Sequence, residues 1–156
     1  MRATVTIYLV RHAKAGNRRD WRGEDDLRPV SPSGQRQADA IADTLTNVGV
    51  ERIMSSPYVR CRQTVDPVAQ RLRLPVELSD ALAEGAPVSE TVRLIDKVIM
   101  ATTVLCTHGD IVDNLLDYLR DHGVPLDDHR DEKGSIWVLE TNDTEVTAGH
   151  YIPAPA

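Results

Sequence analysis

Two histidines and two arginines occupy positions from which they could act on one anion. An apolar, β-branched run ends just before Arg11 and His12, and a second such run ends just before His108. Arg60 comes one helical turn after a third, shorter run. Because ligands bind beyond the carboxyl ends of parallel strands, we expect the four side chains to meet at one edge of a sheet.

These residue types suit the transfer of a phosphoryl group. The transferring group spreads negative charge over three oxygens, so it needs fixed positive donors. Arg11 and Arg60 can each bind an oxygen through a planar guanidinium group, and His108 can donate to a third. His12 is then the predicted in-line nucleophile, giving a phosphohistidine that water cleaves.

His12 has to be neutral to attack. We expect the neighbouring cations to lower its pKa and so favour the neutral ring. A main-chain carbonyl in the following loop is expected to accept a hydrogen bond from the other ring nitrogen and thereby fix the tautomer.

The pattern of strands and helices predicts how these residues are held. Ser31 and Pro32 supply an N-cap and a first-turn proline, and Gly49 is expected to end the helix that they begin. Strands alternating with helices predict an α/β domain, a three-layer sandwich with a mostly parallel central sheet. The predicted strands are residues 4–10, 51–54, 75–78, 102–106, 134–140 and 146–152, and the predicted helices are 32–48, 58–72, 89–99 and a segment after Gly109. Residues 13–30 are expected to form a long functional loop.

Length and charge narrow the function classes. The 156 residues suit one domain spanning 1–156. A net charge of -6 argues against nucleic acid or an anionic membrane as partner. Six of the Arg and Lys residues lie within residues 1–22 together with a single acid, which favours a small anionic ligand.

The apolar runs are too short for a membrane span or a signal peptide, so we expect a cytoplasmic protein. The oligomeric state stays open.

No metal or cofactor is expected. Cys61 and Cys106 are not spaced as zinc ligands, and buried free thiols are the favoured interpretation. The histidines have no accompanying carboxylate cluster of the kind that metal-dependent phosphatases use.

The segments around these residues resemble the histidine phosphatase superfamily. Residues 9–13, LVRHA, look like its RHG/RHA signature, residues 55–64, SSPYVRCRQT, are similar to its SSPxxRxxQT motif, and residues 107–109, THG, resemble its second histidine motif. Residues 28–34, RPVSPSG, look like the compact SixA-type branch. The resemblance covers essentially the whole chain. It implies a phosphoglycerate mutase-like fold and phosphatase or phosphotransfer chemistry without a metal.

A narrower similarity concerns residues 11–16, then Arg18, Trp21, Asp25 and Asp26, then residues 133–139, which together look like histidine phosphatase domains fused behind Nudix hydrolases. Those relatives suggest nucleotide-type or other polyphosphate substrates. Many family members place a glutamate in the loop after the third strand, and Glu84 stands there as the candidate general acid. SixA-type proteins often lack this acid, so the alternative is an ordinary surface glutamate.

The loop after the nucleophile adds predicted substrate contacts. Lys14 and Arg18 are expected to hold a second phosphate or another acidic part of the substrate. The roles of Lys133, Ser135, Trp21 and His150 stay open: the first two are candidates for the pocket rim, and Trp21 is a candidate for base stacking. Arg22 is expected on a solvated face, His122 and His129 are expected to be structural or surface residues, and Asn17 is not counted in the site.

Three functions are compatible with these patterns. The first is a phosphatase acting on a small phosphomonoester or a phosphohistidine protein. The second is a nucleoside or dinucleotide polyphosphate hydrolase, favoured by the basic loop. The third is a phosphate- or phosphohistidine-binding module without turnover, which the intact His12 and His108 disfavour. A mutase would need a larger insertion to retain and reorient its intermediate.

Overall fold

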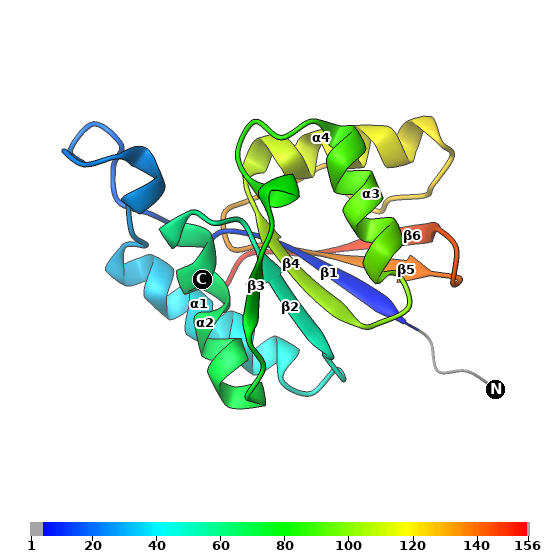
Figure 1. The fold of residues 1–156 in the computed structure, drawn as a ribbon, viewed down its shortest axis with the longest axis horizontal. Helices are drawn as coiled ribbons and strands as arrows, with labels where there is room; N and C mark the ends of the chain where they lie inside the picture. Colours follow the sequence, from blue (N-terminus) through cyan, green and yellow to red (C-terminus); the bar gives the residue numbers. More distant parts are fainter. Residues whose placement is uncertain (1–4, 156) are drawn as a thin grey trace.

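The computed structural model describes residues 5–155, which contain a six-stranded sheet (Figure 1). Its strand order is β3-β2-β4-β1-β5-β6. The strands are β1 (Thr6–Arg11), β2 (Arg52–Ser55), β3 (Val76–Leu78), β4 (Thr103–Thr107), β5 (Ile136–Thr141) and β6 (Val146–Ile152). The first four are mutually parallel, and β5 and β6 form an antiparallel hairpin at one edge. The predicted mostly parallel sheet is therefore confirmed. Thr4 of the first predicted strand and Arg2 of the basic segment lie outside the described residues.

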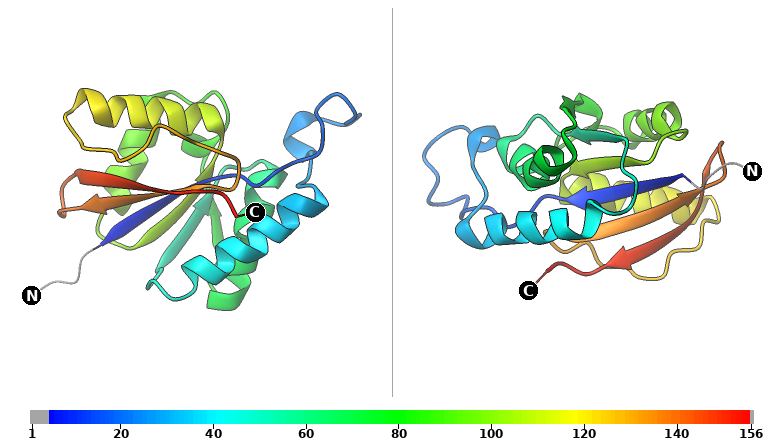
Figure 2. Two further views of the ribbon diagram at one scale, coloured as in Figure 1. Left: turned by 180° about the vertical axis from the view of Figure 1, so that it is seen from behind. Right: turned by 90° about the horizontal axis from the view of Figure 1, so that it is seen from below.

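Two pairs of helices cover the two faces of the sheet (Figure 2). One face carries α1 (Pro32–Leu45) and α2 (Val59–Leu72), and the other carries α3 (Val88–Val98) and α4 (Gly109–Asp121). Alternate residues of a strand point to opposite faces. In β4, Val104 accordingly packs with the α1 and α2 side chains, whereas Leu105 packs with those of α3 and α4. These two cores complete the predicted three-layer sandwich.

The first helix begins as predicted but ends earlier. Ser31 is its N-cap, with Oγ accepting the Gly34 N–H at 3.1 Å. The helix ends at Leu45 and not at Val48. Thr46 and Asn47 are weak helix formers, and the Val48 side chain, which is 38% exposed, does not pack in the core. Short 3-10 helices also occur within the predicted loops, at η1 (Asp25–Leu27) and η2 (Asp80–Leu82).

The start of α1 packs directly on the loop after β1. The Ser31 N–H donates to the Lys14 carbonyl at 2.9 Å. A Cβ at position 34 would lie 1.9 Å from that same carbonyl oxygen, so only glycine fits there. The RPVSPSG segment thus fixes the chain just past the predicted nucleophile.

Among the described residues, no helix is both long enough and apolar enough to cross a membrane.

Replacing the helix cap tests this anchoring. Ser31→Ala should lower the free energy of unfolding by about 1 kcal/mol, because a helix N–H loses its acceptor. Urea unfolding followed by circular dichroism measures the change. Ser89→Ala is the matched control, since Ser89 is an exposed serine in the first turn of α3 and not its cap. Equal unfolding midpoints for the two variants would contradict the capping role.

Candidate active site

The four predicted side chains line one cavity of about 450 Å³ at the carboxyl edge of the parallel strands. Arg11 and His12 come from the end of β1, His108 precedes α4, and Arg60 comes from the first turn of α2. The complete lining is Arg11, His12, Arg18, Arg28, Arg60, Glu84, His108, Gly109, Asp110, Asp113, Asp131 and Lys133.

His12 is held as a neutral ring with one nitrogen free. It is 6% exposed, and its Nδ1 lies 2.8 Å from the Ala13 carbonyl oxygen. A carbonyl can only accept, so Nδ1 carries the proton and Nε2 keeps its lone pair. Burial lowers the pKa of His12 to about 3; the hydrogen bond to Ala13 opposes this shift, and the charges of Arg60 and Arg11 add to it. The cations therefore act in the expected direction, but burial is the larger cause.

Hydrogen bonds join the two strand ends and α2 around this ring. The His12 N–H donates to the Thr107 carbonyl at 2.9 Å. The Ala13 N–H donates to Thr64 Oγ1 at 2.9 Å, and that hydroxyl donates to the Arg60 carbonyl at 2.7 Å. Thr64, the last residue of the SSPxxRxxQT motif, therefore fixes the nucleophile loop and the second arginine relative to each other.

His108 lies beside His12, with ring centroids 5.5 Å apart. Its Nε2 is 2.8 Å from Ser56 Oγ, and that oxygen already accepts the Tyr58 N–H. Nε2 is thus occupied within the protein, and Nδ1 is the ring nitrogen that has no partner. Cys61 Sγ also lies 3.5 Å from Nε2, and both Cys61 and Cys106 are buried free thiols, as predicted.

Both arginines are contacted by aspartates at their outer nitrogens. Arg60 donates from Nη1 to the Asp25 carbonyl at 2.8 Å and from Nη2 to the Asp25 carboxylate at 3.1 Å. Arg11 donates from Nη1 to the Asp131 carbonyl at 2.7 Å, with the Asp131 carboxylate 3.6 Å away.

Three buried side-chain nitrogens at this site have no hydrogen-bond partner. Among the described residues, the buried side-chain nitrogen and oxygen atoms that lack a hydrogen-bond partner are Arg11 Nε, Arg60 Nε and His108 Nδ1. Buried polar groups normally have partners, and leaving one unpaired costs free energy. An anion entering the cavity would bring several acceptors to this group of donors.

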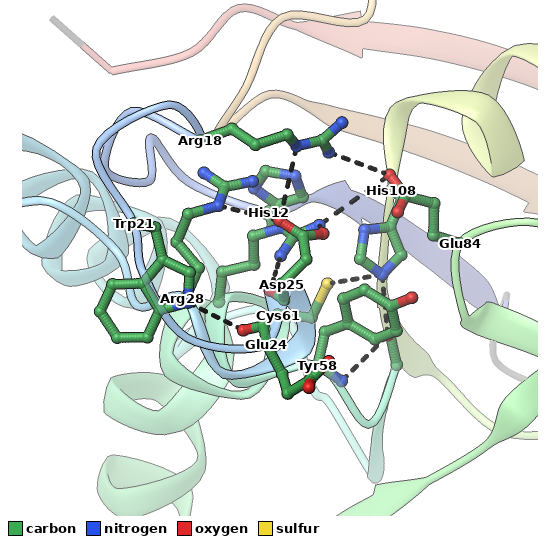
Figure 3. Close-up of polar contacts among 12 residues, drawn as sticks. His12, Arg18, Trp21, Glu24, Asp25, Arg28, Tyr58, Cys61, Glu84 and His108 are labelled. Carbon is green, nitrogen blue, oxygen red and sulfur yellow. Dashed lines mark hydrogen bonds and ion pairs between the residues drawn. The ribbon is translucent and has the colours of Figure 1, made fainter.

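Glu84 reaches the cavity on a loop that is fixed on both sides. Thr107 Oγ1 donates to the Leu82 carbonyl at 2.6 Å, and the Gly85 N–H donates to the Asp110 carboxylate at 2.8 Å. The Glu84 carboxylate lies 3.6 Å from Arg18 and 3.9 Å from Arg60 (Figure 3). The structure thus brings the candidate acid to the predicted site.

The loop residues divide into lining and non-lining positions. Arg18 lines the cavity and pairs with Asp25 at 3.4 Å as well as with Glu84. Lys14 is exposed and is not a lining residue, so its contact with substrate stays a prediction. Trp21 donates to the Glu24 carbonyl at 2.8 Å, which indicates local packing of its side chain.

Of the remaining candidates, Lys133 lines the cavity, and Ser135 is buried with Oγ donating to the Glu132 carbonyl. His150 pairs with Asp127 and Glu140 and is not a lining residue.

Sequence reasoning missed the aspartates of the cavity, Asp110, Asp113 and Asp131, and the buried Arg28. Burial raises the pKa of Asp113 to about 6, together with its hydrogen bond to Asp131. Burial also lowers the pKa of Lys133, with a further contribution from the charge of Arg11. The sequence held one usable signal, because Asp25 and Arg28 lie three residues apart just before the helix cap and can pair. Such a pair matters here, since a polar loop rarely buries an arginine to 7% exposure without an acidic partner.

The chain matches known proteins at three levels. Residues 7–87 match the model of the histidine phosphatase superfamily, branch 1. A relative named 8-oxo-(d)GTP phosphatase from Mycolicibacterium smegmatis is 29% identical over 158 residues, covering 97% of this chain and 49% of that protein. This chain therefore spans about half the length of that curated relative.

Solved structures show the same fold. A protein histidine phosphatase SixA complexed with tungstate superposes with a TM-score of 0.74 at 20% identity, covering 96% of this chain and 95% of that one. The putative phosphohistidine phosphatase SixA from Nakamurella multipartitia gives 0.71 at 23% identity, with coverage of 99% and 97%. The phosphoglycerate mutase-like architecture expected from the sequence is confirmed. The chain belongs to the histidine phosphatase superfamily, branch 1.

Proposed function

We propose that this phosphatase forms a phosphohistidine on His12 and hydrolyses it without a metal. The observation that carries the proposal is the unpartnered set of Arg11 Nε, Arg60 Nε and His108 Nδ1 on side chains that share a cavity with His12. The positive charge of the two arginines and the N-terminal end of α4 would stabilise the charge of the transferring group.

The first step breaks the ester or anhydride bond of the substrate. The lone pair of His12 Nε2 attacks phosphorus, a P–N bond forms, and the P–O bond breaks with its electron pair leaving on oxygen. The hydrogen bond from Nδ1 to the Ala13 carbonyl stabilises the positive charge that develops on the ring. For an alcohol leaving group, Glu84 supplies the proton.

The second step releases inorganic phosphate. Water attacks phosphorus, the P–N bond breaks with its electron pair returning to His12 Nε2, and the Glu84 carboxylate accepts the proton of the water. Arg18 and Arg60 lie within 4 Å of the Glu84 carboxylate that would take this proton.

The proposed substrate is a small phosphomonoester or a phosphohistidine protein. A specific observation favours a polyphosphate as second candidate, because Arg18, Arg28 and Lys133 extend the positive lining beyond Arg11 and Arg60. The name of the mycobacterial relative, 8-oxo-(d)GTP phosphatase, supports the same candidate. Comparing kcat/KM over nucleotides, sugar phosphates and a phosphorylated histidine-domain protein separates the two classes.

The nucleophile can be identified by trapping the intermediate. With p-nitrophenyl phosphate, the wild type should show a burst of product close to one equivalent and an acid-labile phosphorylated protein. His12→Asn should lose the label and on the order of 10³-fold or more in turnover. His129→Asn is the control, since His129 is exposed and is not a lining residue.

Two outcomes of this experiment would count against the proposal. Undiminished turnover by His12→Asn would exclude His12 as nucleophile. Stoichiometric labelling of the wild type without release would instead support the binding module considered from the sequence.

Glu84→Gln tests the general acid. Turnover of alcohol phosphate esters should fall by about 100-fold, because the alkoxide then leaves without a proton. Turnover of p-nitrophenyl phosphate should fall much less, since its leaving group is a weaker base. The ratio of kcat/KM for the two ester types is the measurement, and an unchanged ratio would show that Glu84 does not protonate the leaving group.

The low pKa of His12 predicts that the nucleophile stays available in acid. Because folding lowers this pKa from 6.5 to about 3, the ring should remain neutral as the pH falls from 8 to about 4.5. An NMR titration of the His12 ring, assigned by comparison with His12→Asn, should show no inflection in that range. The same residue in urea-unfolded protein should titrate near its ordinary value, and a midpoint above pH 5 in the folded protein would contradict the prediction.

A further inference from the structure

We infer that Asp25 is a positioning residue that holds Arg60 in its phosphoryl-binding orientation, as Asp131 does for Arg11. The inference rests on the proposed function, because it takes Arg60 to be a ligand of the phosphoryl group. Neither aspartate would touch the reacting atoms.

Asp25 contacts Arg60 through two different groups. Its main-chain carbonyl accepts from Nη1 at 2.8 Å, and its carboxylate accepts from Nη2 at 3.1 Å. Arg60 is only 1% exposed, and its Nε has no partner. Two contacts at the outer nitrogens fix the plane of the guanidinium group and leave Nε for another acceptor.

The second arginine also pairs with the carbonyl and the carboxylate of one loop aspartate, in this case both through Nη1. Arg11 Nη1 donates to the Asp131 carbonyl at 2.7 Å, the Asp131 carboxylate lies 3.6 Å away, and Arg11 Nε has no partner. The other side of this guanidinium packs on Gly109, where an added Cβ would lie 2.7 Å from the Arg11 Cζ. Each arginine is thus paired with an aspartate from a separate loop. This repetition indicates that the site requires both guanidinium groups to be held in a fixed orientation.

Asp25 is itself held in place by a buried cation. Arg28 donates from Nε to the Asp25 carboxylate at 3.1 Å and from Nη1 to the Gly16 carbonyl, so it joins η1 to the loop that follows the nucleophile. Arg18 adds a contact to Asp25 at 3.4 Å (Figure 3). The position of Arg60 therefore depends on the fold of residues 13–30.

A different role for Asp25 would give the opposite result. A carboxylate among Arg18, Arg28 and Arg60 could compete with the substrate for those cations, and removing it would then strengthen anion binding. The pairing of a carbonyl with a carboxylate, repeated at Arg11, favours positioning. The sign of the change in phosphate affinity distinguishes the two roles.

The experiment compares Asp25→Ala and Asp25→Asn with wild type, using inorganic phosphate as the probe. Calorimetry should give a phosphate Kd at least about tenfold weaker for Asp25→Ala, in line with the loss of a charged hydrogen bond. The Kd for Asp25→Asn should be intermediate, because an amide oxygen can still accept from Arg60. Asp26→Ala is the matched control, since it removes an exposed carboxylate from the same short helix. Thermal unfolding of each variant verifies that it is folded.

A double-mutant cycle separates positioning from a general structural role. In an Arg60→Ala background, Asp25→Ala should weaken phosphate binding no further, because the group that it positions is gone. A further loss in that background would overturn the inference, as would unchanged or tighter phosphate binding by Asp25→Ala alone.

The wild type tests the underlying proposal separately. Phosphate binding without turnover of phosphate esters would overturn the proposed function and leave the comparison of Asp25 variants valid. A wild type that binds no phosphate would overturn both.

Discussion

Repulsion among cations that share one cavity is the constraint on which this site depends. Arg11, Arg28 and Arg60 face one cavity together with Lys133, and the folded chain has to hold them together before any anion arrives. Loop aspartates offset part of that charge from the outer side of the guanidinium groups. What remains is a partly neutralised positive lining in a protein whose net charge is -6.

The proposed nucleophile, His12, depends on the same charges and on its burial. Burial keeps the His12 ring uncharged, so the cations around it do not repel it. The hydrogen bond from Nδ1 to the Ala13 carbonyl sets the tautomer of the ring, and its acceptor belongs to the very next residue of the chain. Because the His12 N–H also pairs with the end of β4, small errors in strand register would displace both histidines together.

The sequence predicted the parts of the site that lie at the ends of regular elements. Arg11, His12 and His108 follow strands whose apolar runs are unmistakable, and Ser31 with Pro32 marks a helix start. The partners of the arginines could not be found this way. Asp25 and Asp131 lie in segments without periodicity, and which carboxylate meets which guanidinium is decided by how those loops close over the sheet. Burial, which dominates the pKa of His12, likewise belongs to the assembled structure and not to any motif.

Gln37 on α1 has a consequence for how the chain can be extended. Its side chain accepts the Lys14 N–H and donates to the carbonyls of Lys133 and Pro155, so the main chain at Pro155 is held beside the rim of the cavity. The described chain starts at the opposite end of the sheet, because β1 runs toward the cavity (Figure 1). A purification tag or fused module at the carboxyl end would therefore crowd the entrance for bulky substrates, whereas one at the amino end would leave it open.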